Sequence, residues 1–199
     1  MPNSPVVDVL VSAESSTPTT LEQALLSSSA TPKRRADFVR GRSTCRRLLS
    51  ACLRLSHEEY VGRRISFFPS IEKTLLHIVE VDLFYLAALE FDLEGQRRDL
   101  PAGLTLPQIA QLQFATDARL VAYCERLDEQ SLARSAEVVR PEGIVLERVD
   151  RLLLHLFQHQ IHHRGQVHAM LSGTRVAPPQ LDEFYLDADL PRQIGRAHV

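Results

Sequence analysis

Hydrophobic residues recur at helical spacing in four long segments of the chain. The segments cover approximately residues 36–55, 69–92, 106–129 and 147–172. In the third, Ile109, Leu112 and Leu120 fall on one side of a helix, because side chains three or four positions apart share a face. Helices with one apolar face must bury it against neighbours. The pattern therefore predicts an all-α fold, a four-helix bundle.

The connection between the third and fourth helices has a different pattern. Residues 132–146 contain two short β-prone runs on either side of "RPEG", which is typical of a hairpin turn. We expect a short β-hairpin-like insertion there, so the order of the helices need not be simply up-down-up-down. At the helix ends, Pro69 is suited to the first turn of the second helix, and Gly173 is suited to stop the fourth.

The two ends of the chain fall outside the helical pattern. Residues 1–35 are rich in serine, threonine and proline, a composition that favours a flexible leader. The predicted organisation is a flexible N-terminal leader over 1–35, the helical bundle over 36–190 and a C-terminal tail over 191–199.

Composition and charge exclude several classes of protein. The formal net charge is -2, which gives no electrostatic reason to expect a nucleic acid or a membrane surface as partner. The basic cluster "KRR" at 33–35 is interpreted as a solvated helix start. No run approaches the roughly 18 apolar residues that a membrane span needs, so we expect a cytoplasmic protein. An odd number of cysteines, 3, without CxxC spacing, argues against a disulfide framework or a zinc ribbon.

Histidines interrupt the apolar face of the fourth helix. The stretch "HLFQHQIHHRGQVHAML" holds five of the 8 histidines. On a helical wheel His159 and His163 lie inside the apolar stripe, His155 and His162 lie on its flank, and His168 points away. Burying an unpaired polar ring costs about 1–3 kcal/mol, so each buried imidazole needs a partner.

Histidines four positions apart can share a metal ion. Their ring nitrogens converge from adjacent turns, so the HxxxH spacing fits half of a metal site, although carbonyls, hydroxyls or carboxylates could satisfy the same rings. A third ligand must come from elsewhere. His57 lies in "SHEEY", which we expect to form a turn after the first helix, and is expected to be exposed. His77 lies on the second helix opposite the main apolar stripe, where it faces either another packing surface or a cavity in which ligands assemble.

Several polar positions nearby also need an explanation. Asp82 lies in the main apolar stripe of the second helix, and we expect it to pair with a basic group. Arg164 is expected to anchor a carboxylate or a helix end. Gly165 is either tolerated within the helix or marks the close approach of a neighbouring backbone. His162 and Gln166 flank the ligand face, where they could contact a substrate or serve as solvated or capping groups.

Together these motifs resemble the DinB family of four-helix bundles, which is related to bacillithiol and mycothiol transferases. The resemblance covers about residues 46–187 and rests on "HLFQHQIHHRGQVHAML", "SGTRVAPPQLDEFYL", "SFFPSIEKTLLHIVEVDLFYLAALE" and "VVRPEGIVLERVDRLLLHLF". It implies an unusual bundle connectivity, frequent dimers and a divalent ion held by three histidines. Carried onto this sequence, the ligands are His77, His159 and His163.

Three neutral imidazoles leave open positions on a borderline ion, for which Zn²⁺ and Ni²⁺ are both suitable. The resemblance thus implies a metal-dependent transferase or hydrolase that acts on a thiol-linked small molecule, such as a low-molecular-weight thiol. The alternative is a noncatalytic metal-stabilised bundle that serves as a stress-associated binding or dimerisation module. We expect a homodimer with a small-molecule substrate, no nucleic-acid or membrane partner, and assign no catalytic residue.

Overall fold

The computed structural model describes residues 44–181. The predicted leader over 1–35, the start of the first helix and the predicted tail over 191–199 lie outside the described residues. The described part of the first helix runs over 44–52 and is followed by a turn at 53–55, so the helix ends three residues before the predicted 55.

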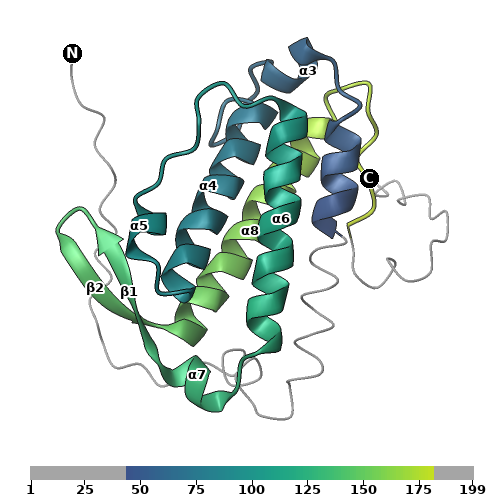
Figure 1. The fold of residues 1–199 in the computed structure, drawn as a ribbon. Coiled ribbons are helices and arrows are strands. Elements are labelled where there is room, and N and C mark those ends of the chain that lie inside the picture. Colours follow the sequence, from purple (N-terminus) through teal and green to yellow (C-terminus); the bar gives the residue numbers. More distant parts are fainter. Residues whose placement is uncertain (1–43, 182–199) are drawn as a thin grey trace.

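The longer helices form the body of the described structure (Figure 1). In chain order the elements are the helix over 44–52, α3 (His57–Val61), α4 (Ile71–Leu89), α5 (Leu93–Gln96), α6 (Leu106–Glu125), α7 (Glu129–Ala133), β1 (Ser135–Arg140), β2 (Gly143–Arg148) and α8 (Val149–Leu171). α4 packs against both α6 and α8. The predicted helical bundle with a hairpin insertion is confirmed. None of the helices within 44–181 is both long and apolar enough to cross a membrane.

The predicted hairpin is present, but it covers residues 135–148 and so lies two to three residues further along the chain than the predicted 132–146. β1 and β2 pair antiparallel with Arg140 opposite Gly143, so the "RPEG" turn joins them. Gly143 has a φ of 135°, which favours glycine. Gln96 fixes β1 to the bundle: its Nε2 donates to the Glu137 carbonyl at 2.9 Å, and its Oε1 accepts from the Val139 N–H at 2.9 Å. A buried side chain thus holds the hairpin beside α4 and α5.

Capping side chains explain where the helices differ from their predicted bounds. The Ser70 hydroxyl accepts from the Lys73 N–H at 3.2 Å and caps α4, so Pro69 lies before the cap and not in the first turn. The third predicted helix is divided near its end. Asp128 accepts from the Ser131 N–H at 2.7 Å and starts the separate α7. A strong N-cap begins a new helix, which the apolar spacing alone does not reveal.

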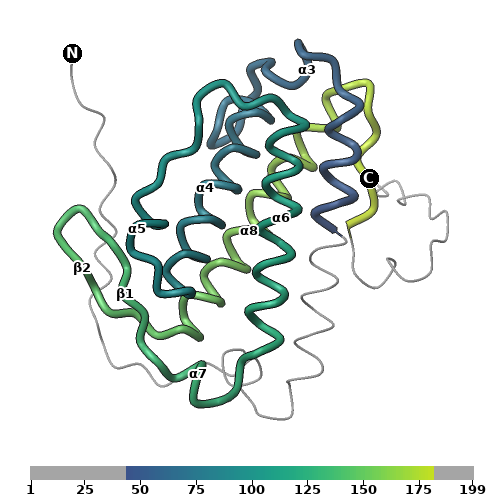
Figure 2. The backbone as a smooth tube through the Cα atoms, viewed as in Figure 1, coloured from purple at the N-terminus to yellow at the C-terminus, as the bar shows by residue number. Residues whose placement is uncertain are grey.

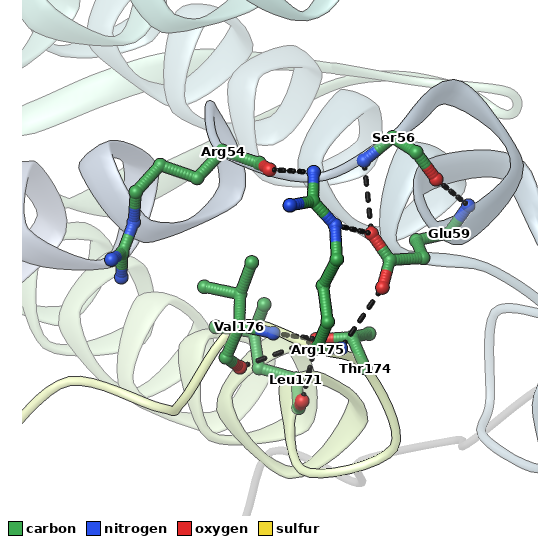
Figure 3. Close-up of polar contacts among 7 residues, drawn as sticks. All are labelled: Arg54, Ser56, Glu59, Leu171, Thr174, Arg175 and Val176. Carbon is green, nitrogen blue, oxygen red and sulfur yellow. Dashed lines mark hydrogen bonds and ion pairs between the residues drawn. The ribbon is translucent and has the colours of Figure 1, made fainter.

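The "SHEEY" segment forms the short helix α3, although the sequence suggested a turn. Ser56 and Glu59 form a capping box, a pattern that the S-x-x-E spacing could have revealed. Figure 3 shows that the Glu59 carboxylate also accepts from the Arg175 backbone N–H at 2.9 Å and from its Nε at 3.1 Å. The same guanidinium donates to the Arg54 carbonyl at 2.6 Å. These donors, the Arg175 N–H foremost, lower the pKa of Glu59 to about 2 and tie the segment after α8 to α3.

The interior contains two apolar clusters with a polar layer between them. One cluster joins the helix over 44–52, the starts of α4 and α6 and the end of α8; the other joins the end of α4, β1 and the start of α8. The side chains between them are Asp82, Gln113, Asp117, Gln160 and Arg164, and all but the half-buried Gln160 are buried. Three helices contribute polar groups to this one level of the bundle.

Gly165 lies on the exposed side of α8. A Cβ built at this position would have no neighbouring atom within 4 Å. The interpretation that Gly165 allows a neighbouring backbone to approach is therefore wrong, and the glycine is simply tolerated.

We predict that Gly165→Ala stabilises the protein by about 0.5–1 kcal/mol, because alanine loses less backbone entropy in a helix. The midpoint of thermal unfolding should rise by roughly 2–4 °C. The matched control is Gly143→Ala, which should lower the midpoint because its φ of 135° strains any L side chain. A lower midpoint for Gly165→Ala would show that the position is constrained after all.

Candidate metal centre

Two adjacent helices bring three imidazoles together. α4 and α8 run side by side through the bundle, as the tube in Figure 2 shows. His77 lies near the middle of α4, and His159 and His163 lie one turn apart on α8. The rings of all three face the seam between the two helices. His77 lies on the side of α4 opposite its main apolar stripe, and this side is therefore the one that contacts α8.

The ring nitrogens converge on one small volume. One potential ligand atom from each of the three histidines lies within 4.8 Å of the other two. Nε2 of His77 and Nε2 of His159 are 2.9 Å apart. The ring centroids are 4.9 Å apart for His77 and His159, 4.7 Å for His77 and His163, and 4.4 Å for His159 and His163. His163 is buried, and the other two are half-buried.

Burial keeps these imidazoles uncharged. Desolvation is the largest cause of the lowered pKa values of His77 and His163. The same effect, together with the neighbouring histidines, lowers the pKa of His159 to about 3. The neutral imidazole carries the lone pair that a metal ion needs, so the environment favours the ligand form near neutral pH.

The side chain of Phe68 covers part of the histidine cluster. Its ring centroid is 4.5 Å from that of His77 and 5.6 Å from that of His163. Phe68 belongs to the segment between α3 and α4, and its neighbour Phe67 packs edge-on against it at 4.9 Å. An apolar ring here lowers the local polarity and limits the approach of water from that direction.

A hydrogen-bonded chain along α8 fixes the tautomer of His163. Nδ1 of His163 lies 2.8 Å from Gln166 Oε1, an oxygen that can only accept, so Nδ1 carries the proton. Gln166 Nε2 in turn donates to His162 Nε2 at 3.0 Å. This leaves Nε2 of His163 free for a ligand. His162 and Gln166, for which the sequence left several roles open, thus orient a ring of the cluster.

The polar layer fastens α4 to α8 beside the histidines. Oδ2 of Asp82 accepts from Gln160 Nε2 at 2.7 Å and from Gln113 Nε2 at 2.7 Å. Burial raises the pKa of Asp82 to about 7, against the opposing effect of these two amides and the more distant charge of Arg164. Two amides donate hydrogen bonds to Asp82, and the positive charge of the expected basic neighbour, Arg164, also acts on the carboxyl group.

The remaining histidines take other positions. His57 is exposed, as predicted. His168 points away from the cluster, and its Nε2 lies 2.9 Å from the Pro179 carbonyl oxygen. His155 lies one turn before His159, with their ring centroids 6.0 Å apart, and contacts the Tyr85 ring at 5.0 Å. The sequence did not reveal this contact with Tyr85, because a helical wheel does not show what the neighbouring helix presents.

The donor set fits a divalent ion. Nitrogen ligands at about 2.1 Å from Zn²⁺ stand roughly 3–4 Å apart in a tetrahedral site, which is close to the spacing found here. Nδ1 of His159 is buried and has no hydrogen-bond partner among the described residues. Such an atom raises the free energy of the metal-free fold, and a favourable interaction at the opposite ring nitrogen would offset this cost. The three histidines are thus compatible with a divalent metal.

A helical bundle with three imidazoles converging between two of its helices defines the class of this protein. The chain belongs to the DinB family, which it matches over residues 38–193. It is similar to the uncharacterized protein YizA of Bacillus subtilis (strain 168), with 25% identity over 129 residues, 64% of this chain and 79% of YizA. The crystal structure of a DinB-like protein, YjoA of Bacillus subtilis, aligns with a TM-score of 0.55 and 20% identity, covering 74% of this chain and 96% of YjoA, and shows the same fold.

We predict that Gln166→Leu weakens zinc binding by about 10–100-fold, because His163 loses the acceptor that fixes its tautomer and ring orientation. Competition with a chromogenic chelator measures the affinity. Gln166→Glu, which keeps an acceptor oxygen, should lose less zinc affinity than Gln166→Leu. Gln158→Leu, at an exposed position on the same helix, is the matched control and should leave the affinity unchanged. Equal affinities for Gln166→Leu and wild type would contradict this role.

Asp82→Asn should change how stability depends on pH. The carboxyl group titrates near 3.8 when unfolded and near 7 when folded, so the native protein binds the extra proton between these values. The contribution of Asp82 to stability is present below 3.8 and is lost as the pH rises through 7. Between about pH 5 and pH 8 the variant should gain about 2.5 kcal/mol relative to wild type.

Urea unfolding of metal-free protein at both pH values measures this difference. The histidines are common to both proteins, so their titration largely cancels in the comparison. A difference between variant and wild type that stays constant with pH would show that the buried carboxyl group has an ordinary pKa.

Proposed function

We propose that the protein binds one divalent ion, Zn²⁺ or Ni²⁺, through His77, His159 and His163, and uses it as a transferase or hydrolase on a thiol-linked small molecule. The observation that carries the proposal is the convergence of three uncharged imidazoles from two helices, with their ligand atoms within 4.8 Å of one another. Family membership supports it, since the chain matches the DinB family over most of its length.

The chain supplies the surroundings that this chemistry requires. A divalent ion bound by three histidines lowers the pKa of a bound thiol or water and polarises a carbonyl group. Phe68 shields the rings from water on one side. Gln166 holds the proton of His163 on Nδ1 and keeps Nε2 directed away from that hydrogen bond. We assign no general base.

A second candidate function is a noncatalytic metal-stabilised bundle, a binding or dimerisation module. The observation that favours it is that the three ligands come from both α4 and α8, so an ion would crosslink the two helices. In this case loss of the metal lowers stability, while no substrate is turned over. For either function we expect a homodimer that acts in the cytoplasm and has no nucleic-acid partner.

We predict that His159→Ala lowers the metal content from about one ion per chain to less than about one tenth, because two histidines alone bind an exchangeable ion weakly. Elemental analysis after loading with Zn²⁺ or Ni²⁺ and desalting measures this. His57→Ala, which removes an exposed histidine, is the control and should retain the metal. Equal metal in wild type and His159→Ala would end the ligand assignment.

The same proteins distinguish the two candidate functions. Conjugation of low-molecular-weight thiols to a chromogenic electrophile, and hydrolysis of thioesters, should require the metal and be lost in His159→Ala if the protein is an enzyme. A metal-dependent rise in the unfolding midpoint with no turnover of either substrate class supports the noncatalytic module.

A further inference from the structure

A positively charged side chain lies on the hairpin beside the histidine cluster. Arg140, at the end of β1, is half-buried, and its guanidinium lies 6.0 Å from the Phe84 ring centroid and 5.8 Å from that of Tyr85. It donates to the Tyr85 hydroxyl at 3.4 Å, a long contact. Within residues 44–181 no carboxylate pairs with it. Most of the five N–H donors of this guanidinium therefore have no protein acceptor there.

Ring contacts connect this arginine to the histidine cluster. Tyr85 contacts His155 with centroids 5.0 Å apart, and His155 contacts His159 at 6.0 Å. His155 precedes His159 by one helical turn, and Tyr85 follows His77 by two turns along α4. These successive contacts place the Arg140 guanidinium within about 17 Å of the His159 ring, a distance that an extended small molecule spans.

The fold holds Arg140 in this place. Gln96 makes two hydrogen bonds to the backbone of β1, at Glu137 and at Val139, immediately before the arginine. The two-residue turn after Arg140 then fixes its register opposite Gly143. These bonds hold the backbone of Arg140, and the contacts with the Phe84 and Tyr85 rings restrict its guanidinium, which reduces the entropy lost on binding.

We propose that Arg140 binds an oxyanion, such as a carboxylate, on the distal end of the same small molecule whose other end reaches the three histidines. This inference rests on the proposed function and names its substrate class: an anionic molecule that also carries a metal-binding group. A planar guanidinium matches the geometry of a carboxylate with two parallel N–H donors. The aromatic rings of Phe84 and Tyr85 beneath it shield the pair from solvent and strengthen it.

The charges along this path agree with an anionic ligand. The guanidinium of Arg140 is always protonated in proteins, so its positive charge is permanent. Arg140 therefore supplies a fixed positive charge at one end of the path, while the histidine cluster supplies uncharged donors at the other.

Matched ligands test the proposal on the cobalt-loaded protein. Mercaptohexanoate and mercaptohexanol have the same thiol and chain length but differ in the terminal carboxylate, and thiolate-to-cobalt absorption reports their binding. Wild type should bind the acid at least about tenfold more tightly than the alcohol, as expected for a charge-assisted hydrogen bond. Arg140→Gln should remove this preference and leave the affinity for the alcohol within about twofold.

Two further variants separate recognition from packing. Arg134 lies immediately before β1, and its guanidinium is 4.7 Å from the Phe91 ring centroid. Arg134→Gln removes this arginine and should keep the preference for the acid. Arg140→Lys keeps the positive charge but lacks the planar guanidinium, and it should retain part of the preference for the acid. Equal weakening of acid and alcohol in Arg140→Gln would show a purely structural role and overturn the proposal.

A second pair of ligands keeps the test independent of the thiol. Suberate monohydroxamate and octanohydroxamate bind metal through a hydroxamate and again differ in a terminal carboxylate. If cobalt binds but no thiol does, the thiol part of the proposed function fails, while a carboxylate preference in the hydroxamates that depends on Arg140 still supports this inference. If neither pair shows such a preference in wild type, the inference is wrong.

Discussion

Exclusion of water from the seam between α4 and α8 is the constraint on which the rest of this structure depends. The same desolvation acts in opposite directions on its two kinds of titratable group. It lowers the pKa values of His77, His159 and His163, and it raises the pKa of Asp82. In both cases the uncharged form is favoured, since a lone charge is costly away from water. At the three histidines the seam is therefore polar but uncharged, a suitable environment for neutral nitrogen ligands.

The fold and much of the candidate site could be predicted because they follow from local patterns. Apolar spacing located the long helices, "RPEG" located the hairpin, and the wheel placed His159 and His163 on the inner face of α8. His77 was different. Its side of α4 could be established only from the packing of α4 against α8, which no spacing within one helix encodes, and here the resemblance to a family supplied the missing information.

The features that sequence reasoning missed depend on side chains far apart in the chain. The amide partners of Asp82 come from α6 and α8, and Gln96 bonds to a strand 41 residues away. Gly165 shows the opposite error, where a local irregularity suggested a close contact that does not exist. Short helices were missed for a simpler reason: α3 and α7 are defined by capping residues, while apolar periodicity needs several turns to become visible.

The polar layer has a consequence for how the helices can be assembled. If α8 slid by one turn, about 5.4 Å, along α4 in one direction, Asp82 would meet the apolar Leu156 in place of Gln160. Two apolar surfaces of leucine and valine tolerate such a slip, because their contacts are interchangeable, but a buried carboxyl group that loses its hydrogen-bond donor does not. The hydrogen bond between Asp82 and Gln160 thus opposes this change of alignment, and the alignment that it favours sets the imidazoles of the two helices side by side.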